Sequence, residues 1–320
     1  MAWHFGRRKK DIPDGLWMRC DSCGKTVYRK DVKNALQVCP QCGFHFSLNC
    51  KQRVEQTLDP SSFEERFPEI RPSDPLGFVD REAYTDRLKR YRDSTGLNDA
   101  IVVGTGRIEG WPVAFGVMET GFMMGSLGSV VGEKIYRLAQ VAVAERLPMI
   151  LVCASGGARM QEGVVALMQM AKTSAAVALL RDNGIPFITV LTNPTTGGTT
   201  ASFATEADVI IAEPHALIGF TGPRVIEETI NQKLPEGFQK SEFMQEHGLV
   251  DMVVSRAEMR KTFGRLLEYL RVEGAPPRQE PPESDEEQQT GGSVIGASDE
   301  PEPEANDERP EPDGEEEDNS

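Results

Sequence analysis

Residues 149–157 read Met-Ile-Leu-Val-Cys-Ala-Ser-Gly-Gly, a short apolar run that ends in a pair of glycines. Six consecutive apolar residues, bounded by a proline and two glycines, are typical of a strand that is buried on both faces. Pro148 closes a helical pattern before the run, and a second helical pattern follows the glycines as far as Asp182. The stretch therefore predicts a helix–strand–turn–helix unit, the repeating element of an α/β fold.

The same alternation continues on both sides of this unit. Further strand signals lie at residues 100–103, 111–118, 187–191, 209–212 and 216–220. Helix signals lie at residues 128–147, between the glycine pair and residue 182, from about Thr199 and from about Arg224. Strands that alternate with helices through short turns predict an α/β fold in which both faces of the sheet are covered.

The charge of the chain is unevenly placed. The whole chain carries a net charge of −15, and residues 275–320 alone hold 17 acidic residues and two arginines. The first 274 residues are therefore neutral, which argues against a generally basic nucleic-acid binder. Residues 1–53 carry 11 basic residues and four aspartates. We expect three domains: a basic N-terminal module at 1–53, a large domain at 54–274, and an acidic tail at 275–320.

The tail and the N-terminus also bear on location. Residues 275–320 are rich in Pro, Glu, Asp, Ser and Gly, and such a segment buries too little apolar surface to offset its ordering entropy. We therefore expect the tail to be disordered. Residues 1–10 are basic but lack the apolar region of a secretory signal. No apolar run approaches the length of about 20 residues that a membrane span needs, so we expect a cytoplasmic protein without a membrane span.

Four of the six cysteines form two Cys-x-x-Cys pairs, Cys20 with Cys23 and Cys39 with Cys42. Two such loops present four thiolates to one cation, which is the ligand set of a closed tetrahedral zinc site. Glycine follows the second cysteine of each pair, where the chain must turn. A redox role would need only one pair, so the pattern predicts one structural zinc. We expect the other two cysteines, Cys50 and Cys153, to be free thiols.

Few side chains suggest acid–base or nucleophilic chemistry. Ser155 lacks the preceding Gly-x of a nucleophile elbow, and no Ser–His–Asp arrangement is visible. Instead, two glycine pairs, Gly156-Gly157 and Gly197-Gly198, follow predicted strands. Backbone N–H groups in such turns can stabilise an oxyanion, because glycine lets a substrate oxygen approach closely. The spacing alone fits two ordinary tight turns equally well.

Several motifs together resemble a known family, the β subunit of the bacterial acetyl-CoA carboxylase carboxyltransferase. Besides the cysteine module, they are Ser-Gly-Gly-Ala-Arg-Met-Gln-Glu at 155–162, Pro-Thr-Thr-Gly-Gly at 194–198, Leu-Ile-Gly-Phe-Thr-Gly-Pro-Arg-Val-Ile at 217–226 and Lys-Leu-Pro-Glu-Gly-Phe-Gln at 233–239. The resemblance covers about residues 17–270 and leaves out the acidic tail.

This resemblance implies a fold, a reaction and partners. The expected fold is a crotonase-like ββα spiral that carries half of an active site and pairs with a separate α subunit in an α2β2 assembly. The expected reaction moves a carboxyl group from carboxybiotin, held by the biotin carboxyl carrier protein, to acetyl-CoA. The product would be malonyl-CoA for fatty acid biosynthesis, and biotin carboxylase would be a further partner.

The resemblance also implies residue roles. Gly197 and Gly198 match the pair whose amides hold the acyl-CoA thioester oxygen, and Gly156 and Gly157 are secondary candidates for a backbone donor. The arginines of the motifs, Arg159 and Arg224, are candidates for contacts with CoA phosphates or with another subunit. A structural ion pair fits each arginine equally well.

Three alternatives remain at this point. The basic cysteine module also fits a zinc ribbon that binds nucleic acid through phosphate contacts. An enoyl-CoA hydratase or isomerase of the same fold would need an acid or base at the oxyanion site, where Glu162 is the one nearby carboxylate. A decarboxylase could use the same two oxyanion holes.

Overall fold

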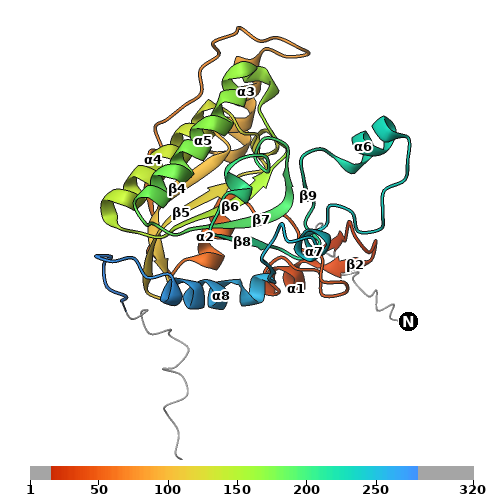
Figure 1. The fold of residues 1–320 in the computed structure, drawn as a ribbon. Helices are drawn as coiled ribbons and strands as arrows, with labels where there is room; N and C mark the ends of the chain where they lie inside the picture. The colour runs from red at the N-terminus through yellow and green to blue at the C-terminus, as the bar shows by residue number, and fades with distance from the viewer. Residues whose placement is uncertain (1–15, 280–320) are drawn as a thin grey trace, which may run out of the picture. The chain divides into compact units, whose positions relative to one another are not determined.

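An eight-stranded mixed sheet forms the centre of residues 16–279, the part of the chain that this computed structural model describes (Figure 1). Its strands follow the order β10-β8-β7-β6-β5-β4-β3, and β9 pairs with β7 beside them. The strands are β3 (Glu64–Arg66), β4 (Ile101–Ile108), β5 (Trp111–Met118), β6 (Met149–Ser155), β7 (Phe187–Thr196), β8 (Val209–Ala212), β9 (Ile218–Gly219) and β10 (Met252–Val253).

The middle of the sheet is parallel. β5, β6, β7 and β8 run in one direction, with Val152 of β6 paired to Val117 on one side and Val190 on the other. β3, β4 and β5 are antiparallel. The carboxyl ends of β6 and β7 therefore meet at one edge of the sheet, and each is followed by one of the two glycine pairs.

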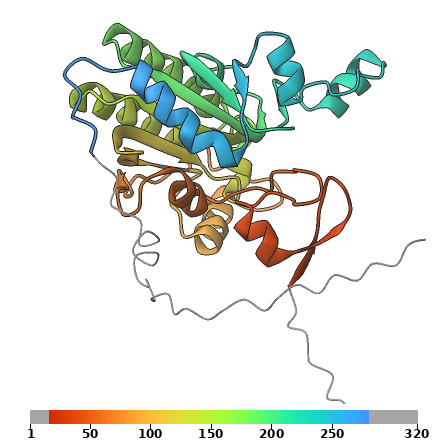
Figure 2. The same ribbon diagram turned by 90° about the horizontal axis from the view of Figure 1, so that it is seen from below.

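Helices cover both faces of the sheet, as the sequence predicted. The helices are α1 (Arg29–Asn34), α2 (Cys50–Thr57), α3 (Tyr84–Thr95), α4 (Ser129–Glu145), α5 (Val164–Asp182), α6 (Pro223–Ile230), α7 (Ser241–Glu246) and α8 (Arg256–Tyr269). In Figure 1, α4 and α5 lie along one face, and Figure 2 shows α8 crossing the other. Each face has its own apolar core, one containing Leu138 of α4 and Leu180 of α5, the other Phe263 and Leu267 of α8.

Two predicted elements differ from the structure. The helix expected from about Thr199 is a turn followed by a single 3₁₀ turn, Phe203–Thr205. Hydroxyl groups there bond to backbone carbonyls, Ser202 Oγ to Gly198 O at 2.6 Å and Thr200 Oγ1 to Thr195 O at 2.8 Å, and such bonds compete with helix formation. The strand expected at 216–220 shortens to two residues, because Ala216 N bonds to Glu213 O in a turn.

Helix α5 is long and apolar enough to cross a membrane by length and composition alone. In the structure, however, it packs against α4 and contributes Ala176, Val177 and Leu180 to the core. Its amino-terminal turns instead leave apolar side chains in solvent, with Val164 63% and Met168 59% exposed. This helix is therefore part of the fold, with one apolar surface left uncovered.

Two contacts lie near the expected domain boundaries. Helix α2 spans the boundary expected after Arg53 and packs Cys50 into the core of the large domain. At the other end, ordered contacts continue past Gly274, because Gln279 N donates to Gly110 O at 3.0 Å. Hydrogen bonds to the large domain therefore continue as far as Gln279. The basic arm at 1–15 and the rest of the predicted disordered tail, 280–320, lie outside the described residues.

Candidate active site and metal centre

The four cysteines of the two Cys-x-x-Cys pairs converge on one point. Their sulfur atoms all lie within 4.8 Å of one another, and Cys20 Sγ lies 3.7 Å from Cys42 Sγ. A tetrahedral zinc with Zn–S bonds of about 2.3 Å holds its sulfurs about 3.8 Å apart. The arrangement therefore fits one zinc with four thiolate ligands and no open coordination position.

The two cysteine loops have the same backbone design. Gly24 N donates to Cys20 O and Gly43 N to Cys39 O, both at 2.9 Å. Both glycines have positive φ angles, 68° and 74°, which glycine adopts without a steric cost. The glycine after each pair is therefore needed to fold the loop around the metal, as the sequence indicated.

A buried ion-pair network joins this ribbon to the large domain. Glu213 accepts from both Arg53, at 2.8 Å, and Arg256, at 2.8 Å. Arg256 also donates to the carbonyls of Leu36 and Gln37 in the ribbon, at 3.2 and 3.0 Å. Burial by itself would raise the pKa of Glu213, but the two guanidinium groups lower it to about 2. The carboxylate therefore stays charged. Through Arg256, it joins the ribbon to the residue that follows β8.

The two glycine pairs lie against each other at the carboxyl edge of the sheet. A Cβ placed on Gly197 would lie 2.8 Å from the Cα of Gly157, closer than real Cβ contacts. Both residues also have positive φ angles, 66° and 114°. Gly157 and Gly197 are therefore required by the close approach of the two turns, whatever else they do.

The four glycine N–H groups differ in whether they already have a hydrogen-bond acceptor. Gly156 N donates to Met124 O, Gly157 N to Ser155 Oγ and Gly197 N to Gly219 O. Gly198 N has no acceptor within residues 16–279, and neither have the next two amides in its turn. Gly198 is nevertheless buried, and an unpaired buried N–H is unusual in a folded protein. Of the four candidate glycines, Gly198 is therefore the one whose amide is free to bind a ligand.

A second free amide belongs to Ala158, which the sequence reasoning missed. Ala158 N has no acceptor in the described part of the chain, and the Ala158 side chain lies 3.6 Å from where a Cβ on Gly198 would be. The two residues with free amides are therefore neighbours on the two turns. Ala158 was missed because alanine gives no compositional signal; its only mark was its position after a glycine pair.

A pocket of about 400 Å³ opens beside these turns. Gly156, Gly157 and Ala158 form one wall, and exposed Met124 and Met160 form part of the rim. Gly197 and Gly198 do not line it. No histidine or carboxylate lines this pocket either. Its polar lining consists of backbone groups and of the side chains of Arg87, Tyr91, Ser126, Arg159 and Gln161.

Arg159 does not face this pocket as a free cation. Its side chain is fully buried and donates to both oxygens of Asp99, at 2.6 and 2.7 Å. It also holds Ser126, whose side chain and carbonyl it contacts at 3.0 Å. Burial alone would lower the pKa of Arg159, but the Asp99 carboxylate raises it. Arg159 therefore forms the structural ion pair that was one of its expected roles, and its contact with CoA phosphates or another subunit stays a prediction.

The remaining candidates have simpler outcomes. Arg224 lies in the first turn of α6, and its side chain lies outside the described structure. Glu162 accepts from Tyr84 Oη at 2.8 Å and from Ser129 N at 2.5 Å, so it supports the turn and is not a free acid or base. Cys50 and Cys153 are buried free thiols, as expected.

Two known protein families match parts of this chain. The carboxyl transferase domain family matches residues 51–303, and the acetyl-CoA carboxylase zinc finger domain family matches residues 17–42. The first match extends past residue 270, where the sequence resemblance was expected to end. The second match assigns the ribbon to a carboxylase module, which does not favour the nucleic-acid alternative.

Curated relatives are similar over most of their length. The chain is 52% identical over 262 residues to the acetyl-coenzyme A carboxylase carboxyl transferase subunit beta of Desulforamulus reducens, covering 82% of this chain and 90% of that protein. It is 51% identical over 275 residues to the protein of the same name from Synechococcus, covering 83% and 94%.

Solved structures share the fold. A transcarboxylase 12S structure with methylmalonyl-coenzyme A bound has a TM-score of 0.58 and 25% identity, covering 69% of this chain and 40% of that larger chain. A Pseudomonas malonate decarboxylase hetero-dimer has a TM-score of 0.53 and 25% identity, covering 72% and 89%. With the matched families and relatives, these likenesses show that the chain belongs to the acetyl-CoA carboxylase carboxyl transferase β-subunit family.

Proposed function

We propose that this chain supplies the acyl-CoA half of a carboxyltransferase site that converts acetyl-CoA to malonyl-CoA for fatty acid biosynthesis. The observation that carries this proposal is the pair of free amides, Gly198 N–H and Ala158 N–H, on adjoining turns, of which Ala158 lines a pocket that has no histidine or carboxylate. Such a site suits a reaction whose main demand is stabilisation of a negative oxygen.

The proposed chemistry needs no side-chain base from this chain. Carboxybiotin on the carrier protein supplies both the carboxyl carbon, as CO2, and the nitrogen that takes the methyl proton of acetyl-CoA. The thioester oxygen gains negative charge as that proton leaves, and the amides of Gly198 and Ala158 donate to it. Because these amides are fixed by the turns, they need little reorganisation when the charge develops. The enolate carbon then attacks CO2 to give malonyl-CoA.

The structure also suggests where the α subunit binds. Two exposed apolar residues, Met124 and Met160, line the pocket. Further exposed apolar side chains lie at the start of α5, on Val164, Leu167 and Met168, and on Leu76, which lies beside Gly163. We call these six residues the rim patch. A concentration of exposed apolar side chains often marks a protein interface. An α subunit seated there would close the pocket and bring the counterpart hole for carboxybiotin, in an α2β2 assembly served by the carrier protein and biotin carboxylase.

The remaining assignments are one structural zinc per chain and a cytoplasmic location. The closed four-cysteine geometry supports a metal that stabilises the ribbon and does no chemistry. A zinc–thiolate site requires reduced cysteines, which is the state kept in a reducing cytosol.

Co-purification tests the proposed partner surface. A tagged chain should retain a carboxyltransferase α subunit, and Leu167→Asp should abolish that retention by placing a charge in the rim patch. Leu249→Asp is the matched control, because Leu249 is equally exposed, 51% for each residue, and lies outside the patch. Equal retention by Leu167→Asp and wild type would move the interface elsewhere, and no retention by wild type would count against the β-subunit role.

A further inference from the structure

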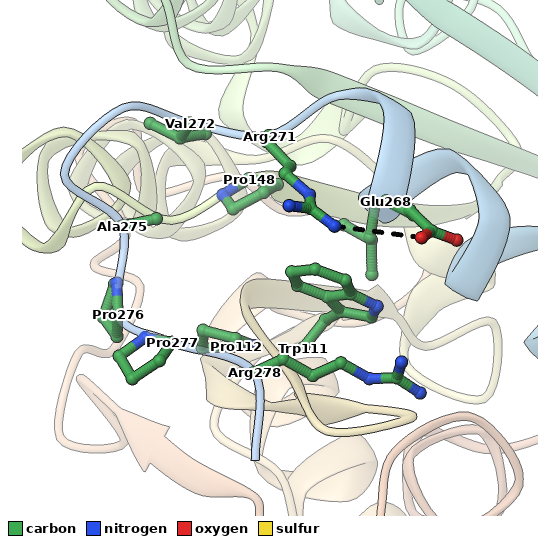
Figure 3. A pocket seen from close by; sticks show the side chains of 11 residues that line it. Trp111, Pro112, Pro148, Glu268, Arg271, Val272, Ala275, Pro276, Pro277 and Arg278 are labelled. Atoms are coloured by element: carbon green, nitrogen blue, oxygen red, sulfur yellow. Dashed lines mark ion pairs between the residues drawn. The ribbon is translucent and has the colours of Figure 1, made fainter. Parts of the chain in front are cut away.

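A second pocket, of about 410 Å³, is shown in Figure 3. It lies at the opposite edge of the sheet from the glycine turns. Trp111 begins β5 and Pro148 immediately precedes β6, so both mark the amino ends of parallel strands. The glycine turns follow the carboxyl ends of β6 and β7, which are parallel to β5. Strands of seven or eight residues separate the two sites by roughly 20 Å. This pocket is therefore not part of the site described above.

Two arginines flank the indole of Trp111. The guanidinium carbon of Arg271 lies 5.3 Å from the ring centroid, and that of Arg278 lies 5.4 Å from it. Figure 3 shows the two side chains on opposite sides of the ring. Cations at this distance from an indole are attracted to its π face. The ring therefore holds two positive charges at the mouth of the pocket.

Both guanidinium groups keep donors available. Arg278 uses only Nε, which donates to Glu109 O at 2.9 Å, and its terminal nitrogens have no acceptor within residues 16–279. Arg271 faces Glu268 at 3.8 Å, and both side chains are more than half exposed. A single exposed ion pair at this distance is weak. An incoming anion could therefore engage either arginine without breaking a buried interaction.

The interior of the pocket is apolar. Its lining beyond Trp111 and the charged groups consists of Pro112, Pro148, Leu267, Val272, Ala275, Pro276 and Pro277. The four prolines have no N–H group to offer a ligand and hold a fixed backbone angle. The cavity therefore has a stiff, apolar wall, and the two arginines lie at its mouth.

Hydrogen bonds hold the outer wall in place. This wall, residues 272–279, ends where Gln279 N donates to Gly110 O at 3.0 Å. Gly110 belongs to the turn between β4 and β5. Asp59 also holds this turn, because its carboxylate accepts from Glu109 N at 3.0 Å and Gly110 N at 2.8 Å. The pocket is therefore formed before any ligand arrives, which lowers the cost of binding.

We propose that this pocket binds a small amphipathic carboxylate, with its apolar body against the proline-rich wall and its carboxylate on one of the two arginines that flank Trp111. The size of the cavity lies within the range that holds small-molecule ligands. The paired guanidinium groups favour an anion over a cation of the same shape, and the apolar interior selects against a small inorganic anion. This inference does not depend on the proposed carboxyl transfer.

Tryptophan fluorescence provides the test. The chain has three tryptophans, so Trp3→Phe combined with Trp17→Phe leaves Trp111 as the only reporter in the full-length, zinc-loaded protein. Octanoate is the probe, and octylamine, a cation with the same alkyl chain, is the matched control. We expect a saturable change in Trp111 emission with octanoate and none with octylamine at the same concentrations.

Substitutions of the two arginines at the mouth of the pocket complete the test. Substitution of the arginine that binds the carboxylate, by Arg271→Ala or Arg278→Ala, should weaken octanoate binding about tenfold or more, because it removes a charge-assisted hydrogen bond. Arg265→Ala should leave binding unchanged, since Arg265 is exposed on α8 and does not line the pocket. Circular dichroism and zinc content confirm folding. Unsaturable octanoate binding, equal binding of octylamine, or unchanged affinity in both mouth variants would overturn the proposal.

Discussion

The zinc ribbon and the glycine turns act through different parts of the polypeptide. In the ribbon, four cysteine side chains converge on one point, and Arg256 and Glu213 fasten the module to the sheet. In the turns, three of the four glycine amides bond within the protein, and the free donors are backbone N–H groups of Gly198 and Ala158. Side-chain substitutions should therefore break the ribbon, whereas the turns should respond only to changes in backbone geometry or access.

The largest effect is expected from Cys23→Ser. Zinc binding contributes on the order of 10–16 kcal/mol to folding such modules, and three thiolates hold zinc much less tightly than four. We expect metal analysis to find about one zinc per chain in the wild type and none in the variant, with loss of ribbon structure. Cys50→Ser is the control, because Cys50 donates to Val117 O away from the metal cluster. Full zinc retention by Cys23→Ser would disprove the four-cysteine site.

The next effect concerns the junction between the two regions. Glu213→Gln leaves Arg53 and Arg256 buried without their charge partner, which typically costs about 3–5 kcal/mol. We expect the free energy of urea unfolding at neutral pH to fall by this amount. Glu246→Gln changes an exposed carboxylate and should have an effect below about 0.5 kcal/mol. Equal stability of Glu213→Gln and wild type would show that the network does not hold the ribbon.

The same residue predicts a pH dependence. The folded-state pKa of Glu213 is about 2, against an ordinary value of 4.5, so its contribution is complete above pH 4.5 and is lost as pH falls toward 2. A shift of this size corresponds to about 3 kcal/mol. The stability difference between wild type and Glu213→Gln should therefore shrink across this pH range. A difference that stays constant from pH 7 to pH 2.5 would contradict the assignment.

A smaller free-energy change, but a specific loss of activity, is expected from Gly198→Ala. The added Cβ would lie 3.0 Å from the end of the flexible Met170 side chain, so the fold should tolerate it. It would also stand beside the free amide and hinder the approach of the thioester oxygen. Loss of one oxyanion donor typically costs 10²–10³ in turnover, and we expect a loss of about 10²-fold with an unchanged melting temperature. Near-normal turnover would remove Gly198 from the proposed oxyanion hole.

The smallest effect is expected from Gly156→Ala in the other turn. Its amide already bonds to Met124 O, and an added Cβ would meet Met124 Cβ at an ordinary 3.4 Å. We expect turnover within about threefold of wild type, since no free donor is affected. A loss as large as that of Gly198→Ala would show that both turns supply donors and that the amide bonding seen here does not separate them.

The ribbon could be predicted from the sequence because its chemistry resides in side chains at fixed spacing. Two Cys-x-x-Cys pairs define the ligands, and the glycine after each pair defines the turn. What could not be predicted was the docking of the ribbon. Glu213 and Arg256 are far from the cysteines in the sequence, and their pairing with Arg53 depends on three elements meeting in the fold.

The glycine turns were only half predictable. The apolar strand at 149–154 and the repeated alternation around it were enough to predict the sheet, its two covered faces and the place of both turns. Sequence pattern does not reveal which amide is already bonded, because that depends on partners such as Met124 O and Gly219 O from other segments. For the same reason Ala158 was missed and Arg159, buried on Asp99, was nominated for a ligand.

The central claim is that this chain holds only half of a carboxyltransferase site. It is tested most directly by measuring malonyl-CoA formation from acetyl-CoA and carboxybiotin, with the purified chain alone and then with a purified α subunit added. We predict almost no product from the chain alone and rapid formation once the α subunit is present. Comparable turnover by the isolated chain, or no turnover with both subunits present, would contradict the account.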